Sequence, residues 1–148
     1  TAPTSTLITL GSDNSVNGNT ATYIMYSWTG IPGYSKFGSY EGNGNTNGPY
    51  ADCGFSPSWF ITRRVEGGSN AYIWDTAREP ANLNNSPLQA NDPGAEPANY
   101  DNYFDILSNG IKSRSSNAGT NSNDDRHVFM AFAEQPGITP FDTFANAR

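Results

Sequence analysis

A chain of 148 residues with 15% charged residues and a net charge of −6 is long enough for one domain with a hydrophobic core, but short for two. Its eight Lys and Arg residues form no basic stripe and its apolar runs are only a few residues long, which excludes nucleic acid as a partner and insertion into a membrane. Cys53 is the single cysteine, so an internal disulfide framework and a cysteine-rich metal site are excluded too.

The first predicted element is a β-hairpin within residues 1–30. Residues 6–10 and 21–28 have the composition of strands, and the polar segment between them is rich in Gly, Asn and Ser. In the second of these strands, Ile24, Tyr26 and Trp28 share one face because side chains alternate along a strand.

Further short strands follow in the next part of the chain. Residues 34–40 are predicted to be a strand. The sequence EGNGNTNGP at 41–49 is predicted to be a loop, because it consists mainly of turn-forming residues. The strand at 58–65 begins after Pro57, because proline cannot pair inside a central ladder. A Gly-rich turn then leads into 71–75, which completes a second hairpin.

Residues 76–99 contain four prolines and have neither a helical nor a strand period. A segment of this length without regular structure is uncommon in a compact domain unless it covers a surface or has a function. At its start, Asp75 and Arg78 are interpreted as an ion pair that fixes the end of the preceding strand.

The last predicted elements are two more hairpins. Residues 100–107 and 111–115 pair across an Asn-Gly turn, and 126–134 pairs back on 111–115 beyond a polar tip. Both faces of 126–134 are apolar at its centre, which predicts a strand covered on both sides. With no segment of helical period, the chain is predicted to be all-β: an antiparallel β-sandwich of jelly-roll or lectin-like type without a long helix.

An internal repeat relates the two ends of the chain. An offset of 104 residues aligns 1–44 with 105–148 without a gap, and a fixed period is typical of tandem units. The offset pairs Ser12 with Ser116, Asn17 with Asn121, Pro32 with Pro136, Gly33 with Gly137, Phe37 with Phe141, Leu7 with Ile111, Ile24 with Val128, Met25 with Phe129, and Trp28 with Phe132.

The repeat predicts a division of the chain into 1–30, the terminal hairpin of a preceding repeat unit, and 31–148, a complete β-sandwich unit. An isolated hairpin is not stable in water. We therefore expect residues 1–30 to dock on the unit of their own chain or to complete a sheet in a neighbour. The apolar residues expected to make this contact are Leu7, Ile8, Leu10, Ile24, Tyr26 and Trp28.

The sequence offers little for catalysis. His127 is the single histidine and is expected to face water or its acidic neighbours. Tyr23 occupies its position at the offset of 104, so this position is interpreted as requiring a ring rather than imidazole chemistry. No catalytic residue and no cofactor are predicted. A polysaccharide depolymerase with paired acids within 76–99 is the least favoured alternative function.

Two sets of loop residues are weaker candidates for ligand binding. The oxygen-rich residues Asn121, Asn123, Asp124 and Asp125 suit a hard cation such as calcium. The equivalent tip at 17–21 lacks both acids, so solvated polarity is favoured and no metal is predicted. Tyrosines in or beside loops are expected to pack at the edge of the core, or else to contribute to a subunit interface, or else to bind a sugar, in that order of preference. They are Tyr34, Tyr40, Tyr50, Tyr100 and Tyr103.

A series of motifs resembles a repeat module found in virion proteins of tailed bacteriophages, notably marine ones, and usually described as tail-fibre-type. The motifs are GYSKFGSYEGNG at 33–44, GPY at 48–50, CGFSP at 53–57, DTAR at 75–78, FDILSNG at 104–110 and FMAFAE at 129–134. The chain departs from that pattern in Arg63, where a lysine is expected, and in its acidic tip at 123–125. The resemblance brings no catalytic residues.

The resemblance implies a non-enzymatic structural or adhesive module of an extracellular virion appendage. Such a module packs against copies of itself or other virion proteins and displays loops to the host surface. A glycan-binding, lectin-like module is the alternative. A chain that opens on Thr1 rather than Met is expected to be a processed product or part of a longer protein.

Overall fold

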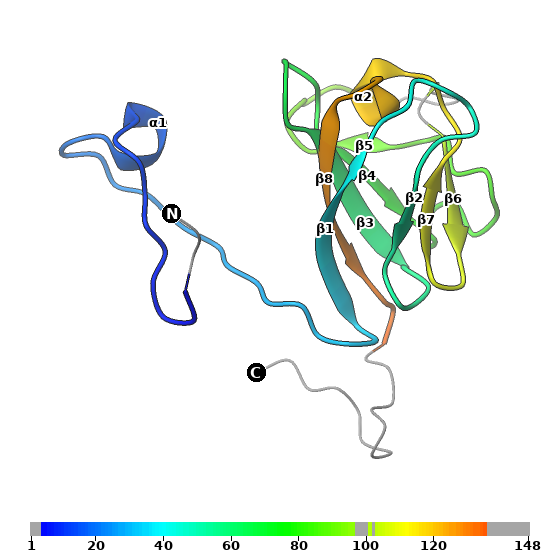
Figure 1. The fold of residues 1–148 in the computed structure, drawn as a ribbon, viewed down its shortest axis with the longest axis horizontal. Helices are drawn as coiled ribbons and strands as arrows, with labels where there is room; N and C mark the ends of the chain where they lie inside the picture. Colours follow the sequence, from blue (N-terminus) through cyan, green and yellow to red (C-terminus); the bar gives the residue numbers. More distant parts are fainter. Residues whose placement is uncertain (1–3, 97–100, 102, 136–148) are drawn as a thin grey trace, which may run out of the picture.

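The computed structural model describes residues 4–96, 101 and 103–135. These residues form a β-sheet body and an N-terminal segment that leads away from it (Figure 1). The body has a five-stranded sheet with the order β1-β8-β3-β4-β5 and a three-stranded sheet with the order β2-β7-β6. All strand pairs are antiparallel. The predicted all-β sandwich without a long helix is therefore confirmed.

The strands agree with most of the predicted ones. The five-stranded sheet consists of β1 (Ser35–Glu41), β3 (Trp59–Arg64), β4 (Tyr72–Asp75), β5 (Leu88–Gln89) and β8 (Arg126–Phe132). The three-stranded sheet consists of β2 (Tyr50–Asp52), β6 (Phe104–Leu107) and β7 (Gly110–Ser113). Two single-turn helices, α1 (Asn14–Asn17) and α2 (Ala118–Asn121), complete the described elements.

The core between the two sheets is aromatic. Phe60 from β3, Trp74 from β4 and Phe104 from β6 are each at most 1% exposed. The Phe104 ring lies 5.3 Å from Phe60 and 4.8 Å from Trp74, and Phe60 stacks on Trp74 at 5.0 Å. Each such ring buries a large apolar area and gains further from its edge or stacked contacts. This cluster joins the two sheets.

Strand β8 lies at the centre of the larger sheet. It pairs with β1 on one edge and with β3 on the other, over seven and six residue pairs. Its inward face is buried at His127, Phe129 and Ala131, whereas Val128 on the other face is 44% exposed. The prediction that both faces of this strand are covered is therefore wrong. At the end of β8, the half-buried Phe132 on this face packs against Trp59, its cross-strand neighbour on β3.

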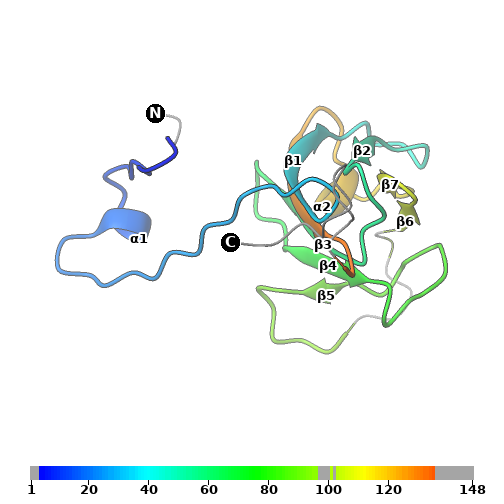
Figure 2. The ribbon, with the colours of Figure 1, turned by 90° about the horizontal axis from the view of Figure 1, so that it is seen from below.

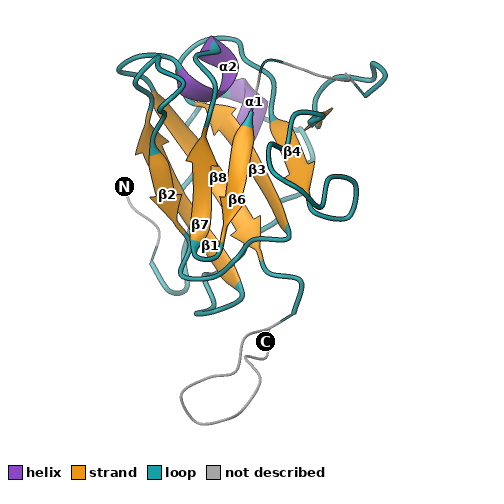
Figure 3. Cartoon of the chain, turned by 90° about the vertical axis from the view of Figure 1, so that its right-hand side faces the viewer, coloured by secondary structure: helices purple, strands orange, loops and turns teal. Residues whose placement is uncertain are grey.

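The chain crosses from one sheet to the other between β7 and β8. These strands belong to different sheets, and α2 connects them over one end of the sandwich (Figure 3). The predicted hairpin of 111–115 with 126–134 is therefore wrong. Packed sheets lie about 10 Å apart, and the twelve-residue connection at 114–125 supplies the length for this crossing, whereas a hairpin keeps both strands in one sheet.

The N-terminal segment contains no strand among residues 4–34. Its predicted strands at 6–10 and 21–28 do not pair with each other, so the hairpin expected for 1–30 is not formed in its described part. Two perpendicular views show the segment standing apart from the body (Figures 1 and 2). The body begins at an isolated bridge between Ile31 and Ser35. Of the predicted unit 31–148, residues 97–100, 102 and 136–148 lie outside the described residues.

Candidate docking segment

Helices α1 and α2 start in the same way, at positions 104 residues apart. The Asp13 side chain accepts a hydrogen bond from the Ser15 backbone N–H at 2.8 Å, and the Asn117 side chain accepts one from Gly119 at 2.8 Å. Asp and Asn are preferred at this position because their oxygen satisfies an unpaired N–H of the first turn. The same local rule therefore forms both helices.

An asparagine closes the loop around each helix. Asn17 Nδ2 donates to the Gly11 carbonyl at 2.9 Å, and Asn121 Nδ2 donates to the Ser115 carbonyl at 2.7 Å. Both bonds span six residues, and both pairs are again separated by 104. The repeat seen in the sequence is therefore also a repeat of side-chain structure.

Backbone conformation agrees as well. Thr20 has a φ of 65° and Asp124 a φ of 59°, and they are the non-glycine residues with positive φ in the described chain. This left-handed conformation is uncommon, above all for a β-branched residue such as Thr. Its presence at equivalent positions shows that residues 11–21 adopt the structure of residues 115–125.

The surroundings of the two asparagines differ. Asn121 is fully buried, and its Oδ1 accepts from the Asn43 backbone N–H at 2.8 Å. Its Nδ2 also lies 3.0 Å from Asn43 Oδ1 and 2.8 Å from the Asn45 carbonyl, so it holds the loop at 41–49. Asn17 lies in an exposed segment, and among the described contacts its side chain bonds to the Gly11 carbonyl alone. The N-terminal copy thus lacks the loop that surrounds α2.

The histidine of the body lies in the core. His127 is 0% exposed and stacks on the Tyr40 ring with centroids 5.1 Å apart and planes within 5°. Burial lowers its pKa from the ordinary value of 6.5. The expectation that His127 faces water is wrong, because the alternation of β8 turns this residue inward. The acidic neighbours Asp125 and Glu66 do act on it, since both oppose the lowering of its pKa. The stacking on Tyr40 agrees with the interpretation that this position requires a ring, which was based on Tyr23 as the equivalent residue.

All six residues predicted to dock are exposed. They are Leu7 (62%), Ile8 (41%), Leu10 (51%), Ile24 (80%), Tyr26 (73%) and Trp28 (57%). The repeat pairs Leu7 with Ile111, which is fully buried in β7. It pairs Ile24, Tyr26 and Trp28 with the outward face of β8.

Sequence reasoning missed the residues that correspond to the inward face of β8. Tyr23 and Met25 are equivalent to the buried His127 and Phe129, yet are 42% and 61% exposed themselves. The alignment at 104 contained this signal. It could not be used without the structure, because both faces of β8 are apolar and the sequence does not tell which one is inward.

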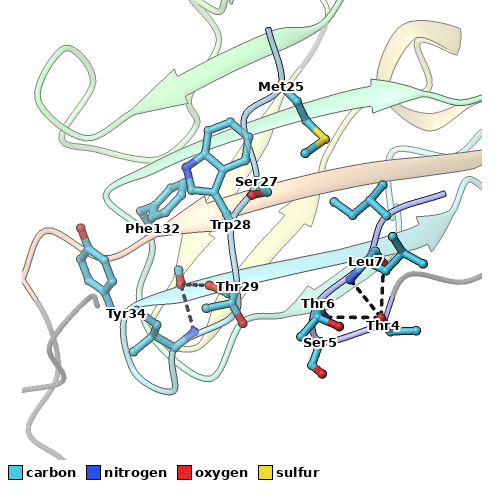
Figure 4. A pocket seen from close by; sticks show the side chains of 13 residues that line it. Thr4, Ser5, Thr6, Leu7, Met25, Ser27, Trp28, Thr29, Tyr34 and Phe132 are labelled. Atoms are coloured by element: carbon cyan, nitrogen blue, oxygen red, sulfur yellow. Dashed lines mark hydrogen bonds between the residues drawn. The ribbon is translucent and has the colours of Figure 1, made fainter. Parts of the chain in front are cut away.

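A cleft lies where the N-terminal segment joins the body (Figure 4). Leu7, Met25 and Trp28 line it from the segment, and Tyr34 and Phe132 line it from the body. The Ser35 hydroxyl lies 3.2 Å from the Thr29 carbonyl and 3.0 Å from the Ile31 N–H, which fixes the junction. The cleft leaves the apolar residues of the segment open to solvent.

The candidate glycan tyrosines do not form one platform. Tyr40 is 8% exposed and its hydroxyl donates to the Thr120 carbonyl at 2.8 Å, so its prediction as a glycan contact is wrong. Tyr34 packs edge-on against Phe132, while Tyr50 on β2 is 42% exposed and its hydroxyl lies 3.0 Å from an Asp52 oxygen. Among the described residues no ring contact joins Tyr34, Tyr50 and Tyr103. Tyr100 lies outside the described residues.

The candidate cation loop is used in other ways. The Asn121 amide is committed to the loop at 41–49, and Asp125 pairs with Arg64 at 2.6 Å. The Asn123 amide donates to Asp124 at 2.5 Å. Within 4–96, 101 and 103–135, no group of three or more His, Cys, Asp or Glu side chains is arranged to hold a metal ion.

Arg78 organises the long segment after β4. Its Nε lies 2.6 Å from Asp75 Oδ2, which confirms the predicted ion pair, and its guanidinium also bonds to Glu96 and to the Ser86 carbonyl at 2.8 Å. Glu79 accepts from the Ser86 N–H at 2.9 Å. These contacts fold the segment around Arg78 and give Glu79 and Glu96 structural partners, and a bridge between Asn84 and Phe104 links the segment to β6.

Comparison with known proteins places the chain in a family. No curated protein and no solved structure is significantly similar to the chain. In the described part of the chain, no helix is long and apolar enough to cross a membrane. A family model described as a domain of unknown function, DUF7483, matches residues 1–136, which include 6–28 and their equivalents 110–132. The chain therefore belongs to the DUF7483 family.

Proposed function

We propose that this protein is a non-enzymatic structural and adhesive module of an extracellular bacteriophage appendage, such as a tail fibre. In this role it packs against units of its own kind and against other virion proteins. One observation carries the proposal: residues 6–28 present, in exposed form, a second copy of the segment 110–132, which supplies strands to both sheets of the body. A surplus piece of the fold is what a chain of tandem units contains at a unit boundary.

The exposed apolar side chains support an assembly role. Ile24, Tyr26 and Trp28 are more than half exposed along one short stretch. Contiguous exposed apolar surface marks an interaction site in soluble proteins. The body needs no such exposure for its own stability, because its core is closed by the two sheets.

The construction of the body supports a mechanical role. Its longest irregular segment is held by Arg78 and Glu79, and its loop at 41–49 is held by Asn121. Loops with satisfied hydrogen bonds open less often and resist proteases. The resemblance of the motif series to repeat modules of tailed-phage virion proteins supports the virion as the location.

Immunogold electron microscopy tests the proposal. Antibodies raised against the 148-residue chain are expected to label an appendage of purified virions. Virions that carry no label, in a lysate where the antibodies detect the protein elsewhere, would contradict the virion assignment.

Two assays distinguish the alternative functions. Glycan-array binding that is lost in Tyr50→Ala or Tyr103→Ala, and kept in Tyr26→Ala, would make the protein a glycan-binding module. Release of oligosaccharides from host polysaccharide would make it a depolymerase. We expect neither signal from the purified chain.

A further inference from the structure

We propose that residues 6–28 are the β7–α2–β8 part of a second unit of this fold, and that they become ordered by filling the matching gap in that unit. The inference rests on the proposed function, since it names the surface through which units pack. Its partner is defined by structure: a sandwich in which strands like β1 and β3 leave a gap between them.

The gap has a defined width and length. In the body, β8 separates β1 from β3 and pairs with β1 over all seven of its residues and with β3 over six, so a unit without β8 has two open strand edges facing each other. Residues 22–28 have the seven-residue length of β8 and have no sheet partner in the described chain. Adding a strand at such a position satisfies both rows of backbone groups at once.

The side chains of the segment suit the gap. Tyr23 replaces His127 as the ring that stacks on a Tyr40-like partner, and Met25 replaces Phe129. Ser27 replaces the fully buried Ala131, a change of one hydroxyl. The segment therefore supplies side chains of similar size, in the same order, as those that the body buries.

Asn17 supplies the polar contact. Its backbone and amide already have the geometry of Asn121, including the bond to the carbonyl six residues earlier. In the body, that geometry presents Oδ1 to the N–H of Asn43 and the asparagine carbonyl to the N–H of Gly44. We infer that Asn17 binds the corresponding loop of the acceptor unit in the same way.

The acceptor is not a second copy of this unit. Its gap is already filled by β8, and two glycines shape that gap for its own segment. A Cβ at Gly110 would lie 2.2 Å from the Ala51 carbonyl oxygen, and one at Gly119 would lie 3.0 Å from the Tyr72 ring. The N-terminal copy has Thr6 and Ser15 at these positions. The partner is therefore a unit of the same fold with room for both side chains.

A two-unit chain tests this inference. A second copy of residues 31–109 is fused directly before Thr6 of the chain 6–148, so that Thr6 follows residue 109 as Gly110 does. The acceptor in this chain is built from residues of this unit, which has no room for a side chain at positions 110 and 119. The equivalent residues are therefore replaced, by Thr6→Gly and Ser15→Gly. We expect the amides of 22–28 to exchange with deuterium about 100-fold more slowly, or slower, than in the 148-residue chain.

Matched variants make the result specific. Asn17→Ala in the two-unit chain is expected to remove most of the protection of 22–28, whereas Asn19→Ala is expected to keep it. A version carrying residues 110–132 in place of 6–28 is the folding control. The second unit, residues 31–148 with their own β8, serves as an internal control, because protection of its β8 amides from exchange shows that the molecule is folded.

Two results would overturn the inference. If 22–28 remain unprotected while the second unit and the folding control are protected, the segment does not fill the gap. If 22–28 become protected in the 148-residue chain as its concentration rises, the acceptor is a second copy of this unit. Neither result bears on the virion location, which immunogold labelling tests separately.

Discussion

Residues 11–21 and 115–125 have the same backbone structure and opposite environments. The caps, the asparagine-to-carbonyl bonds and the positive φ values agree at positions 104 apart. The strands that follow do not agree: 126–132 form the central strand β8, and 22–28 pair with nothing in the described chain. Local hydrogen bonds are therefore sufficient for the helical turn, whereas a strand forms only where a neighbouring strand pairs with it.

The largest expected difference between the two copies comes from their inward side chains. Phe129→Ala is expected to lower the free energy of unfolding by about 3–5 kcal/mol, because it opens a cavity in the core. Met25→Ala at the equivalent position is expected to change it by less than about 0.5 kcal/mol in the 148-residue chain. Urea denaturation followed by tryptophan fluorescence measures both. A comparable loss in Met25→Ala would mean that the segment packs on its own body.

The asparagine pair should differ by a smaller amount. Asn121→Ala removes the bonds to the loop at 41–49 and leaves the buried Ser115 carbonyl without the amide that donates to it, which costs about 2–3 kcal/mol. Asn17→Ala has no loop to release, so its effect on the body should be near zero. Thermal denaturation of the two variants tests this. Equal shifts would show that the two asparagines have the same surroundings in solution.

The stability of the body should depend on pH through His127, which has no equivalent histidine in the N-terminal copy. Burial lowers its pKa in the folded state, so the unfolded state takes up the proton first as pH falls below about 6.5. Asp125 and Glu66 oppose the lowering, and Arg64 adds to it. Stability is therefore lost on acidification, by at most about 1.4 kcal/mol per pH unit.

His127→Phe tests this dependence. The variant keeps a ring on Tyr40 and should lose the decrease in stability between about pH 6.5 and 5. Asp75 and Asp125 have lowered pKa values and contribute at lower pH, below their ordinary value of 3.8. Urea midpoints at several pH values give the comparison. The same decrease in wild type and variant would assign the pH dependence to other groups.

The sequence predicted most strands of the body, because turn residues such as those at 41–49 and 108–110 mark their ends. It did not predict that β7 and β8 lie in different sheets, since both a hairpin and a crossing have a polar tip between two apolar runs. The inward face of β8 was hidden by its two apolar faces, and Tyr23 and Met25 were missed for this reason. Tyr40 agrees with the first preference for the loop tyrosines, a core edge, but its position near a loop did not exclude it from the candidate glycan contacts.

The most direct test of the account is hydrogen–deuterium exchange of the 148-residue chain at low concentration. We predict that the amides of 126–132 exchange at rates set by opening of the body, and that those of 22–28 exchange close to the rates of an unstructured peptide. Protection of 22–28 equal to that of 126–132 in this monomer would contradict the account, because it would mean that the N-terminal copy already has its partner.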